Sequence, residues 1–238
     1  MVYDIITDEN KLINRCTEID PQKESPLLRK IVSGLKDTIK EKGLTSLSAP
    51  EIGFDKRVFV IKYGENQLVA YINPMVSKAV GLDFQKETCP AIPDKVFLLP
   101  RNTEIDIMYM TPLGDIKSQH LVGLAARTFL HCSEHLEGVL ISDIGLEIDD
   151  EFDKASEEER LELIKAYADS LDIMLKQTLD EIEADPELKQ ISDGIKFTES
   201  VRKGETKIKA VTIDEADQEK MVERNLAYAD AKNKGEID

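Results

Sequence analysis

The sequence predicts an α+β protein that ends in an acidic, mostly helical extension. Up to about residue 150, short β-rich runs alternate with turn residues, and segments with helical spacing lie before and after these runs. Beyond that point the apolar residues recur at steps of three and four, which is the spacing of one helix face. These observations predict a domain over 1–150 and an extension over 151–238.

The first helix is predicted over 26–43, because its apolar residues follow helical spacing and Gly43 is a suitable C-terminal cap. Two β-patterned runs follow at 58–63 and 68–74. Only the residues Gly-Glu-Asn-Gln separate them, so we expect the two strands to form a β-hairpin.

Two more strands are predicted at 95–99 and 104–110, and the turn-forming sequence Thr-Pro-Leu-Gly-Asp occupies 111–115. A second helix is expected over 120–138, where Gly138 ends it. Strand-rich and helical segments that follow one another in this way indicate antiparallel strands packed against helices, which is the α+β class.

The extension is acidic: residues 151–238 contain 24 acidic and 14 basic side chains, a net charge of −10. Ser156 and Glu159 have the spacing of a capping box and predict the start of a helix of roughly 28 residues. Its apolar stripe consists of Leu161, Ile164, Ala168, Leu171, Leu175, Leu179 and Ile182. A β-like pair within 195–213 and a polar helix from Asp214 complete the prediction.

The apolar stripe at 161–182 has two interpretations. It packs on the protein's own core, or it presents a groove-binding or coiled-coil face to a protein partner or a larger assembly. The spacing of the residues agrees with both.

The composition argues against several classes of function. A formal net charge of −16 and a pI near 4.7 predict repulsion of phosphate backbones and anionic lipid, so we expect no nucleic acid and no membrane binding. The first residues, MVYDIITDENKL, lack the pattern of a secretory signal, and no stretch approaches the ~20 apolar residues of a membrane helix. Three cysteines are too few for a disulfide framework, so we expect a soluble cytoplasmic or intracellular protein.

Three side chains predict a binding site for one divalent metal ion. His131 and His135 are four residues apart on the second predicted helix, so both imidazoles project from one face. Metal sites use this spacing to hold one ion by two nitrogens. Cys89 lies in the proline-bounded segment ETCPAIP just before a strand and adds a third ligand. A thiolate and two imidazoles leave the fourth position open to water.

Three ordered segments surround these residues: SLSAPEIG at 46–53, ETCPAIP at 87–93 and ARTFLHCSEHLEG at 126–138. They resemble the motifs G-L-A-A-P-Q-I-G, E-G-C-L-S-I-P and A-R-x-x-Q-H-E-x-D-H-L-x-G of peptide deformylases. The resemblance covers residues 10–145 and implies antiparallel strands around a central metal-binding helix.

The resemblance also implies the chemistry of the site. It makes Cys89, His131 and His135 the ligands of one Fe(II) or Zn(II) ion, and it makes formyl-methionyl peptides the substrates. Bacteria, organelles and bacterial viruses all carry members of this family, so the source, and incorporation into a virus particle, stay open.

Three residues depart from the family pattern where it carries the chemistry. Cys132 stands at the position of the glutamate that moves protons, and the loss of a general acid–base group costs about 10²–10⁴-fold in rate. Glu51 stands at the position of an oxyanion-binding glutamine, and an ionised carboxylate donates no hydrogen bond. Pro90 follows the cysteine and has no N–H for the oxyanion, and each lost donor costs roughly 10²–10³-fold.

Two residues are candidates to replace the missing acid–base group. Glu134 is a carboxylate on the same helix, but it lies about 200° around the axis from Cys132, and the resemblance makes it a support for a ligand histidine. Cys132 itself is expected to be a small, partly buried thiol, with a nucleophile or a fourth ligand as the alternative.

Several other residues have structural expectations. Cys16 is expected in the core, and His120 is expected in solvent at the start of the second helix. Glu87 is expected to form an ion pair with Arg101 or Arg127.

The leading hypothesis from the sequence is a deformylase-like metal-binding protein with little or no catalytic activity, which acts through protein contacts. It rests on the retained ligands and the changed residues around them. One alternative is an active peptide deformylase that removes the formyl group from N-terminal formyl-methionine. Another is a structural subunit of a larger assembly, such as a bacteriophage virion.

Overall fold

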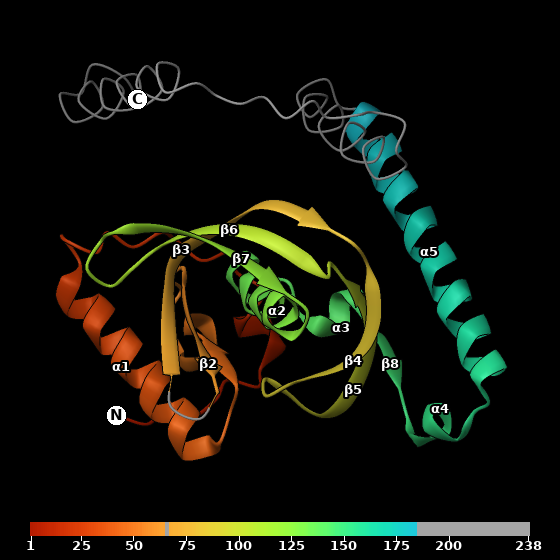
Figure 1. Cartoon of the computed structure of the whole chain (residues 1–238), viewed down its shortest axis with the longest axis horizontal. Coiled ribbons are helices and arrows are strands. Elements are labelled where there is room, and N and C mark those ends of the chain that lie inside the picture. Colours follow the sequence, from red (N-terminus) through yellow and green to blue (C-terminus); the bar gives the residue numbers. More distant parts are fainter. Residues whose placement is uncertain (65–66, 185–238) are drawn as a thin grey trace. The chain divides into compact units, whose positions relative to one another are not determined.

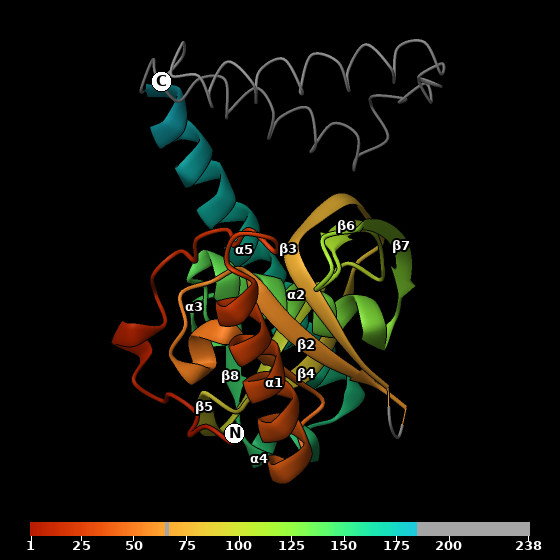
Figure 2. The same cartoon turned by 90° about the vertical axis from the view of Figure 1, so that its left-hand side faces the viewer.

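The computed structural model describes residues 1–64 and 67–184 of the chain. Met1–Tyr167 form one compact unit, which contains both of the sheets found in the described residues, and a second unit begins at Ala168. The arrangement of helices and strands in the first unit can be followed in two perpendicular views (Figures 1 and 2).

The first predicted helix forms as α1 (Ser25–Lys42). Pro26 lies in the first turn, where its missing N–H breaks no helical hydrogen bond. Gly43 ends the helix in the left-handed conformation, with φ 67°, as the sequence predicts. The buried face of the helix is formed by Leu28, Ile31, Val32, Gly34, Leu35, Thr38 and Ile39.

A five-stranded antiparallel sheet stands against this helix, with strand order β1-β2-β3-β6-β7. Its strands are β1 (Ser46–Ser48), β2 (Val58–Tyr63), β3 (Gln67–Val80), β6 (Glu104–Met110) and β7 (Ile116–Val122). The predicted hairpin is confirmed, since β2 and β3 pair in register up to Tyr63 and Gln67.

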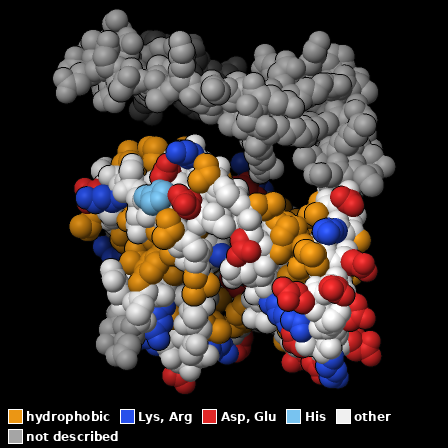
Figure 3. Space-filling view, turned by 45° about the vertical axis from the view of Figure 1, so that its right-hand side comes forward, with side chains coloured by type: hydrophobic (Ala, Val, Ile, Leu, Met, Phe, Trp, Pro, Cys, Tyr) orange, Lys and Arg blue, Asp and Glu red, His pale blue; other side chains and the backbone are white. Residues whose placement is uncertain are grey.

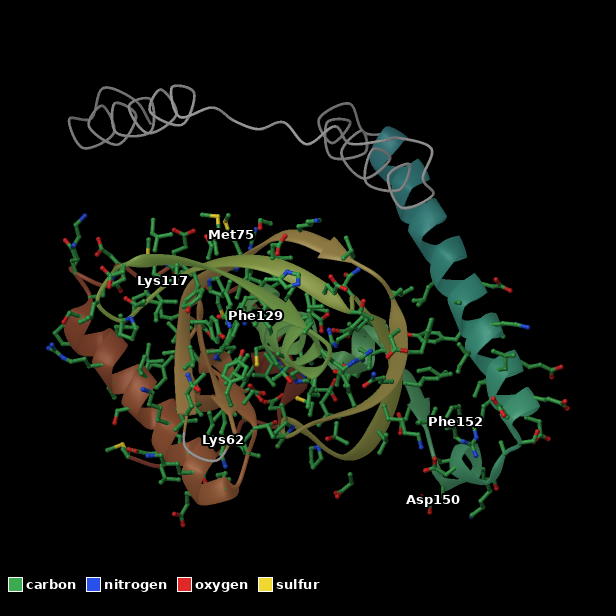
Figure 4. All side chains as sticks on the ribbon, viewed as in Figure 1. Lys62, Met75, Lys117, Phe129, Asp150 and Phe152 are labelled. Atoms are coloured by element: carbon green, nitrogen blue, oxygen red, sulfur yellow. The ribbon has the colours of Figure 1, made fainter. Side chains whose placement is uncertain are left out.

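The β2 strand is covered on both faces. Val58 and Val60 belong to the hydrophobic cluster under α1, whereas Phe59 and Ile61 belong to the cluster under α2 (Leu124–Glu137). Phe129 of α2 points into the second cluster, where its ring centroid lies 5.1 Å from that of Phe59 (Figure 4). The helix that carries the two histidines is thus anchored on the sheet by aromatic packing.

A second antiparallel sheet has the order β4-β5-β8 and lies on the other side of α2. Its strands are β4 (Asp83–Cys89), β5 (Ile92–Arg101) and β8 (Leu146–Ile148). Figure 1 shows α2 in the middle, with strands of both sheets around it. The predicted α+β core, with antiparallel strands around a central helix, is therefore confirmed.

The predicted start of the second helix is wrong. Residues 116–122 form β7, and α2 begins only at Leu124, after Gly123 at φ 56°. His120 therefore lies in a strand, paired with Asp106 of β6, although its side chain is 55% exposed as expected. The helical spacing of the local residues competes here with long-range pairing to β6, and the pairing prevails.

Short helices complete the compact unit, namely η1 (Glu9–Lys11), η2 (Ala49–Ile52), α3 (Ile141–Ile144) and α4 (Asp150–Lys154). The long α5 (Glu157–Ala184) has 28 residues, which agrees with the predicted length. Ser156 N and Oγ lie 2.7 and 2.9 Å from Glu159 Oε2, so the predicted capping box is present. Acidic side chains gather around α4 and the start of α5 (Figure 3).

The β-like pair within 195–213 and the helix from Asp214 lie outside the described residues. The division of the chain at residue 150 stays a prediction. In the part of the chain that the structure describes, no helix combines the length and the apolar character needed to cross a membrane.

Candidate metal centre

Cys89, His131 and His135 meet at one point of the fold. Cys89 lies at the end of β4, where Pro90 and Ala91 turn the chain into β5, and both histidines lie on α2. The three ligand atoms all lie within 4.8 Å of one another. Cys89 Sγ is 3.3 Å from His135 Nε2, and both residues are buried.

The spacing and the chemistry of these donors fit one divalent ion. Zn–S and Zn–N bonds of about 2.3 and 2.0 Å place two ligands of a tetrahedral ion about 3.5 Å apart, close to the observed sulfur–nitrogen distance. Burial lowers the pKa of His135 to about 3, so its ring is neutral and free to bind metal at neutral pH. Burial raises the pKa of the Cys89 thiol, while backbone hydrogen bonds from Ala91 and Ile92 act in the opposite direction. A bound divalent cation adds the positive charge that a thiolate needs.

A buried carboxylate orients His131. Glu87 Oε2 lies 3.4 Å from His131 Nδ1, which leaves Nε2 as the nitrogen available to an ion. Glu87 is held in turn by Arg101, through bonds of 2.6 and 2.9 Å, and by Arg127 Nη1 at 2.6 Å. The expected ion pair is confirmed, and it involves both arginines rather than one of them.

Glu134 joins the same network from α2. Arg101 Nη1 donates to Glu134 Oε1 at 2.5 Å, so Glu134 is linked to His131 through Arg101 and Glu87. Burial alone would raise the pKa of Glu87, but hydrogen bonds from His131 and the two arginines outweigh it and lower that pKa to about 2. Glu87 therefore stays ionised at neutral pH, and its ion pairs connect β4, β5 and α2 around the ligands.

Glu51 of η2 also lies beside the ligand cluster. Its Oε2 accepts a hydrogen bond from Ser48 N at 2.7 Å, and its Oε1 lies 4.0 Å from His135 Nε2. Burial raises the pKa of Glu51 to about 7, so both the protonated and the ionised form are populated near neutral pH. The expectation of an acceptor-only group applies to only one of these forms.

The surroundings of Cys132 argue against a catalytic role for its thiol. It is 1% exposed and packs in the aromatic cluster with Phe59, Tyr71 and Phe129. Burial raises the pKa of its thiol to about 12, so the thiolate needed for nucleophilic attack is scarce. The metal-binding cluster of the described residues does not include it. Cys16 is likewise a buried core thiol, as expected.

A pocket of about 300 Å³ opens beside the ligands, with His131 and Glu87 in its wall. Leu44, Pro90 and Leu124 give it an apolar part, while other lining residues are polar or charged. Its volume is at the lower end of the roughly 300–1,000 Å³ typical of small-molecule sites. One of the three ligands, His131, thus borders a space that a substrate side chain can enter.

Sequence reasoning missed two supports of this site. The contact of Arg101 with Glu134 joins two elements that are far apart in the sequence, whereas the hydrogen bond from Ser48 to Glu51 is local. The capping-box spacing of Ser48 and Glu51 is the signal that predicts the second contact.

The fold and the site define a protein with a candidate site for one metal ion, whose ligands come from one hairpin and one central helix. The chain belongs to the polypeptide deformylase family, whose model matches residues 2–148. The family predicted from the three motifs is confirmed.

Individual relatives agree with this assignment. The peptide deformylase of Desulfitobacterium hafniense is 32% identical over 124 residues, which are 52% of this chain and 82% of the relative. The crystal structure of peptide deformylase from Thermotoga maritima superposes with a TM-score of 0.54 at 27% identity, over 60% of this chain and 97% of that one. A class I type b peptide deformylase from Acinetobacter baumannii gives a TM-score of 0.57 over 60% and 99%, and at 20% identity it shows the likeness of fold alone.

Proposed function

We propose that the chain is an active peptide deformylase, which hydrolyses the formyl group of formyl-methionyl peptides with one bound Fe(II) or Zn(II) ion. The observation that carries this proposal is the complete Cys89–His131–His135 cluster beside an accessible pocket. A divalent ion in such a cluster acts as a Lewis acid on water and on the formyl oxygen. The neutral imidazole of His135 and the buried ion pairs of Glu87 keep the ligands in a form that binds such an ion.

The proposal reverses the order of the hypotheses drawn from the sequence. Low activity was expected because Cys132, Glu51 and Pro90 replace groups that carry the family's chemistry. A carboxyl group nevertheless remains next to the ligands, on η2, as Glu51. The site therefore keeps three metal ligands, a pocket and a group able to take up a proton, and these together favour the active alternative.

The rival is a low-activity protein that acts through a protein partner or an assembly, such as a virion. Two observations favour it: Pro90 offers no N–H, and Leu161, the first residue of the apolar stripe at 161–182, is 50% exposed. It predicts stoichiometric metal without formate release. In its assembly form it also predicts a stable multi-subunit complex by light scattering.

The test combines elemental analysis with a formate assay on the same preparation. We expect one Fe or Zn per chain, and formate release from formyl-Met-Ala-Ser but no reaction with acetyl-Met-Ala-Ser. His135→Ala should lose both metal and formate release. His120→Ala, which changes the histidine on β7, should lose neither. Full metal content without formate release would support the rival, and absence of metal from the wild type would refute the metal centre.

A further inference from the structure

Three carboxyl groups surround the metal ligands, and they differ in their partners. Glu87 is paired with Arg101 and Arg127, and Glu134 is paired with Arg101. Glu51 has no Lys or Arg within ion-pair distance in the described part of the chain, and the ionisable groups that it faces include His135 and His131. A carboxylate held by two guanidinium groups is a poor proton acceptor, because protonation breaks its ion pairs. Glu51 is the one of the three that is free of this constraint.

The carboxyl group of Glu51 is also held in a defined orientation. Ser48 N–H donates a hydrogen bond to Glu51 Oε2, and Glu51 is 2% exposed. The other oxygen of Glu51, Oε1, lies 4.0 Å from His135 Nε2. Glu51 is not a member of the ligand cluster, whose atoms all lie within 4.8 Å of one another. Its free oxygen therefore lies beside the ligand positions, at a place suited to a hydrogen bond with a reacting molecule rather than to coordination.

Cys132, the neighbour of His131 along the chain, does not compete for this role. Its side chain belongs to the buried cluster that contains Phe59, Tyr71 and Phe129. Its thiol also lies beside the hydroxyl groups of Ser46 and Ser48. Ser48 connects the two positions, since its N–H holds Glu51 while its hydroxyl donates to the carbonyl oxygen of Cys132 at 3.3 Å. The carboxyl group of this site is thus presented by η2 and not by the helix that carries the histidines.

We propose that Glu51 is the catalytic carboxyl group of this site, and that Cys132 is a packing residue. The proposal rests on the proposed deformylase function. Water attacks the formyl carbon while one of its protons passes to Glu51 Oε1. The same proton passes on to the amide nitrogen as the C–N bond breaks. The products are formic acid, which ionises to formate, and the free amine, and Glu51 returns to its carboxylate form.

Two variants separate the roles of these residues. Glu51→Gln keeps the shape of the side chain and an oxygen for Ser48 N–H, but it cannot accept the proton. We expect it to retain wild-type metal content and melting temperature while kcat/KM falls about 10²–10⁴-fold. Cys132→Ala removes only the thiol, so we expect kcat/KM within about threefold of the wild type, since a packing group takes no part in the transition state.

A second readout does not depend on turnover. Acetohydroxamic acid loses its hydroxyl proton when it chelates a metal ion, and a free carboxylate beside the ion can take that proton. Calorimetric titration of the metal-loaded proteins at pH 8, in two buffers of different ionisation enthalpy, counts the protons that reach the buffer. Glu51→Gln should release roughly one more proton per site than the wild type, and Cys132→Ala should match the wild type.

The outcomes distinguish this proposal from the function on which it rests. Loss of formate release and one extra released proton in Glu51→Gln, with metal retained, would support the role of Glu51. Near wild-type turnover in Glu51→Gln, equal proton release, or loss of its metal would overturn that role. An equal loss of turnover in Cys132→Ala with full metal content would also overturn it. A wild type that releases no formate would refute the deformylase function, and the proton count would still report on Glu51.

Discussion

Arg101 donates two hydrogen bonds to Glu87, from Nε to Oε1 at 2.6 Å and from Nη2 to Oε2 at 2.9 Å. The guanidinium group is buried and also binds Glu134, so one arginine joins β4, β5 and α2. Because Glu87 in turn contacts His131, this pair couples the stability of the fold to the position of a metal ligand.

Glu87→Gln should therefore weaken both the fold and the metal centre. Removal of the Glu87 charge leaves the buried Arg127 without its carboxylate partner and leaves Arg101 with Glu134 alone, which costs about 3–5 kcal/mol of unfolding free energy. We expect metal affinity to fall about 10–100-fold as His131 loses its support. Urea unfolding and metal competition measure the two effects. The control is Glu147→Gln, which removes an exposed pair with Lys95 and should change stability by less than about 1 kcal/mol. Equal effects in both variants would contradict the account.

The same carboxylate predicts a dependence of stability on pH. The folded pKa of Glu87 is about 2, below its ordinary value of 4.5, so the unfolded chain binds the proton more tightly. The stability that Glu87 contributes is complete above the unfolded pKa and is lost as the pH falls from about 5 toward 2. In metal-free protein, the unfolding free energy of the wild type should therefore fall more steeply over this range than that of Glu87→Gln. Parallel curves of unfolding free energy against pH for the two proteins would refute the lowered pKa of Glu87.

Metal removal should destabilise the fold by mass action. An ion present at 1,000 times its dissociation constant stabilises the folded state by about 4 kcal/mol. EDTA should therefore lower the melting temperature of the wild type and of His120→Ala, and added Zn(II) should restore it. His135→Ala should melt at the same temperature with and without EDTA. A response to EDTA that persists in His135→Ala would place the ion elsewhere.

The pocket beside His131 predicts that a substitution in its wall weakens substrate binding without changing metal binding. Thr128 lines this pocket from α2, so Thr128→Trp should fill it and raise KM for formyl-methionyl peptides at least about tenfold, with metal content unchanged. Lys117→Trp adds the same bulk to exposed β7, outside the pocket (Figure 4), and should leave KM unaffected. An unchanged KM in Thr128→Trp would show that the peptide side chain binds elsewhere.

Elements with local signals were predictable from the sequence, and those that depend on distant pairing were not. Spacing and capping residues predicted α1 and the start of α5, and alternating β-rich runs predicted the hairpin of β2 and β3. The strand β7 was missed because the residues after His120 also suit a helix, and only pairing with β6 decides between the two. The same holds for β8, which forms by pairing with β5.

The site divides in the same way. His131 and His135 were predictable because a spacing of four residues places both side chains on one face of a helix. Cys89 was predictable because the prolines around it mark a turn. The surroundings of Cys132 and the position of Glu51 depend on how β1, η2 and α2 pack together. For this reason the sequence alone favoured a loss of activity, whereas the packing shows a carboxyl group beside the ligands.

The most direct test of the central claim is formate release by protein that carries one Fe(II) per chain. We expect saturable release from a formyl-methionyl peptide with kcat/KM on the order of 10⁴ M⁻¹s⁻¹ or more, lost in metal-free protein and restored by Fe(II). Formate release no faster from the loaded protein than from the metal-free protein would contradict it.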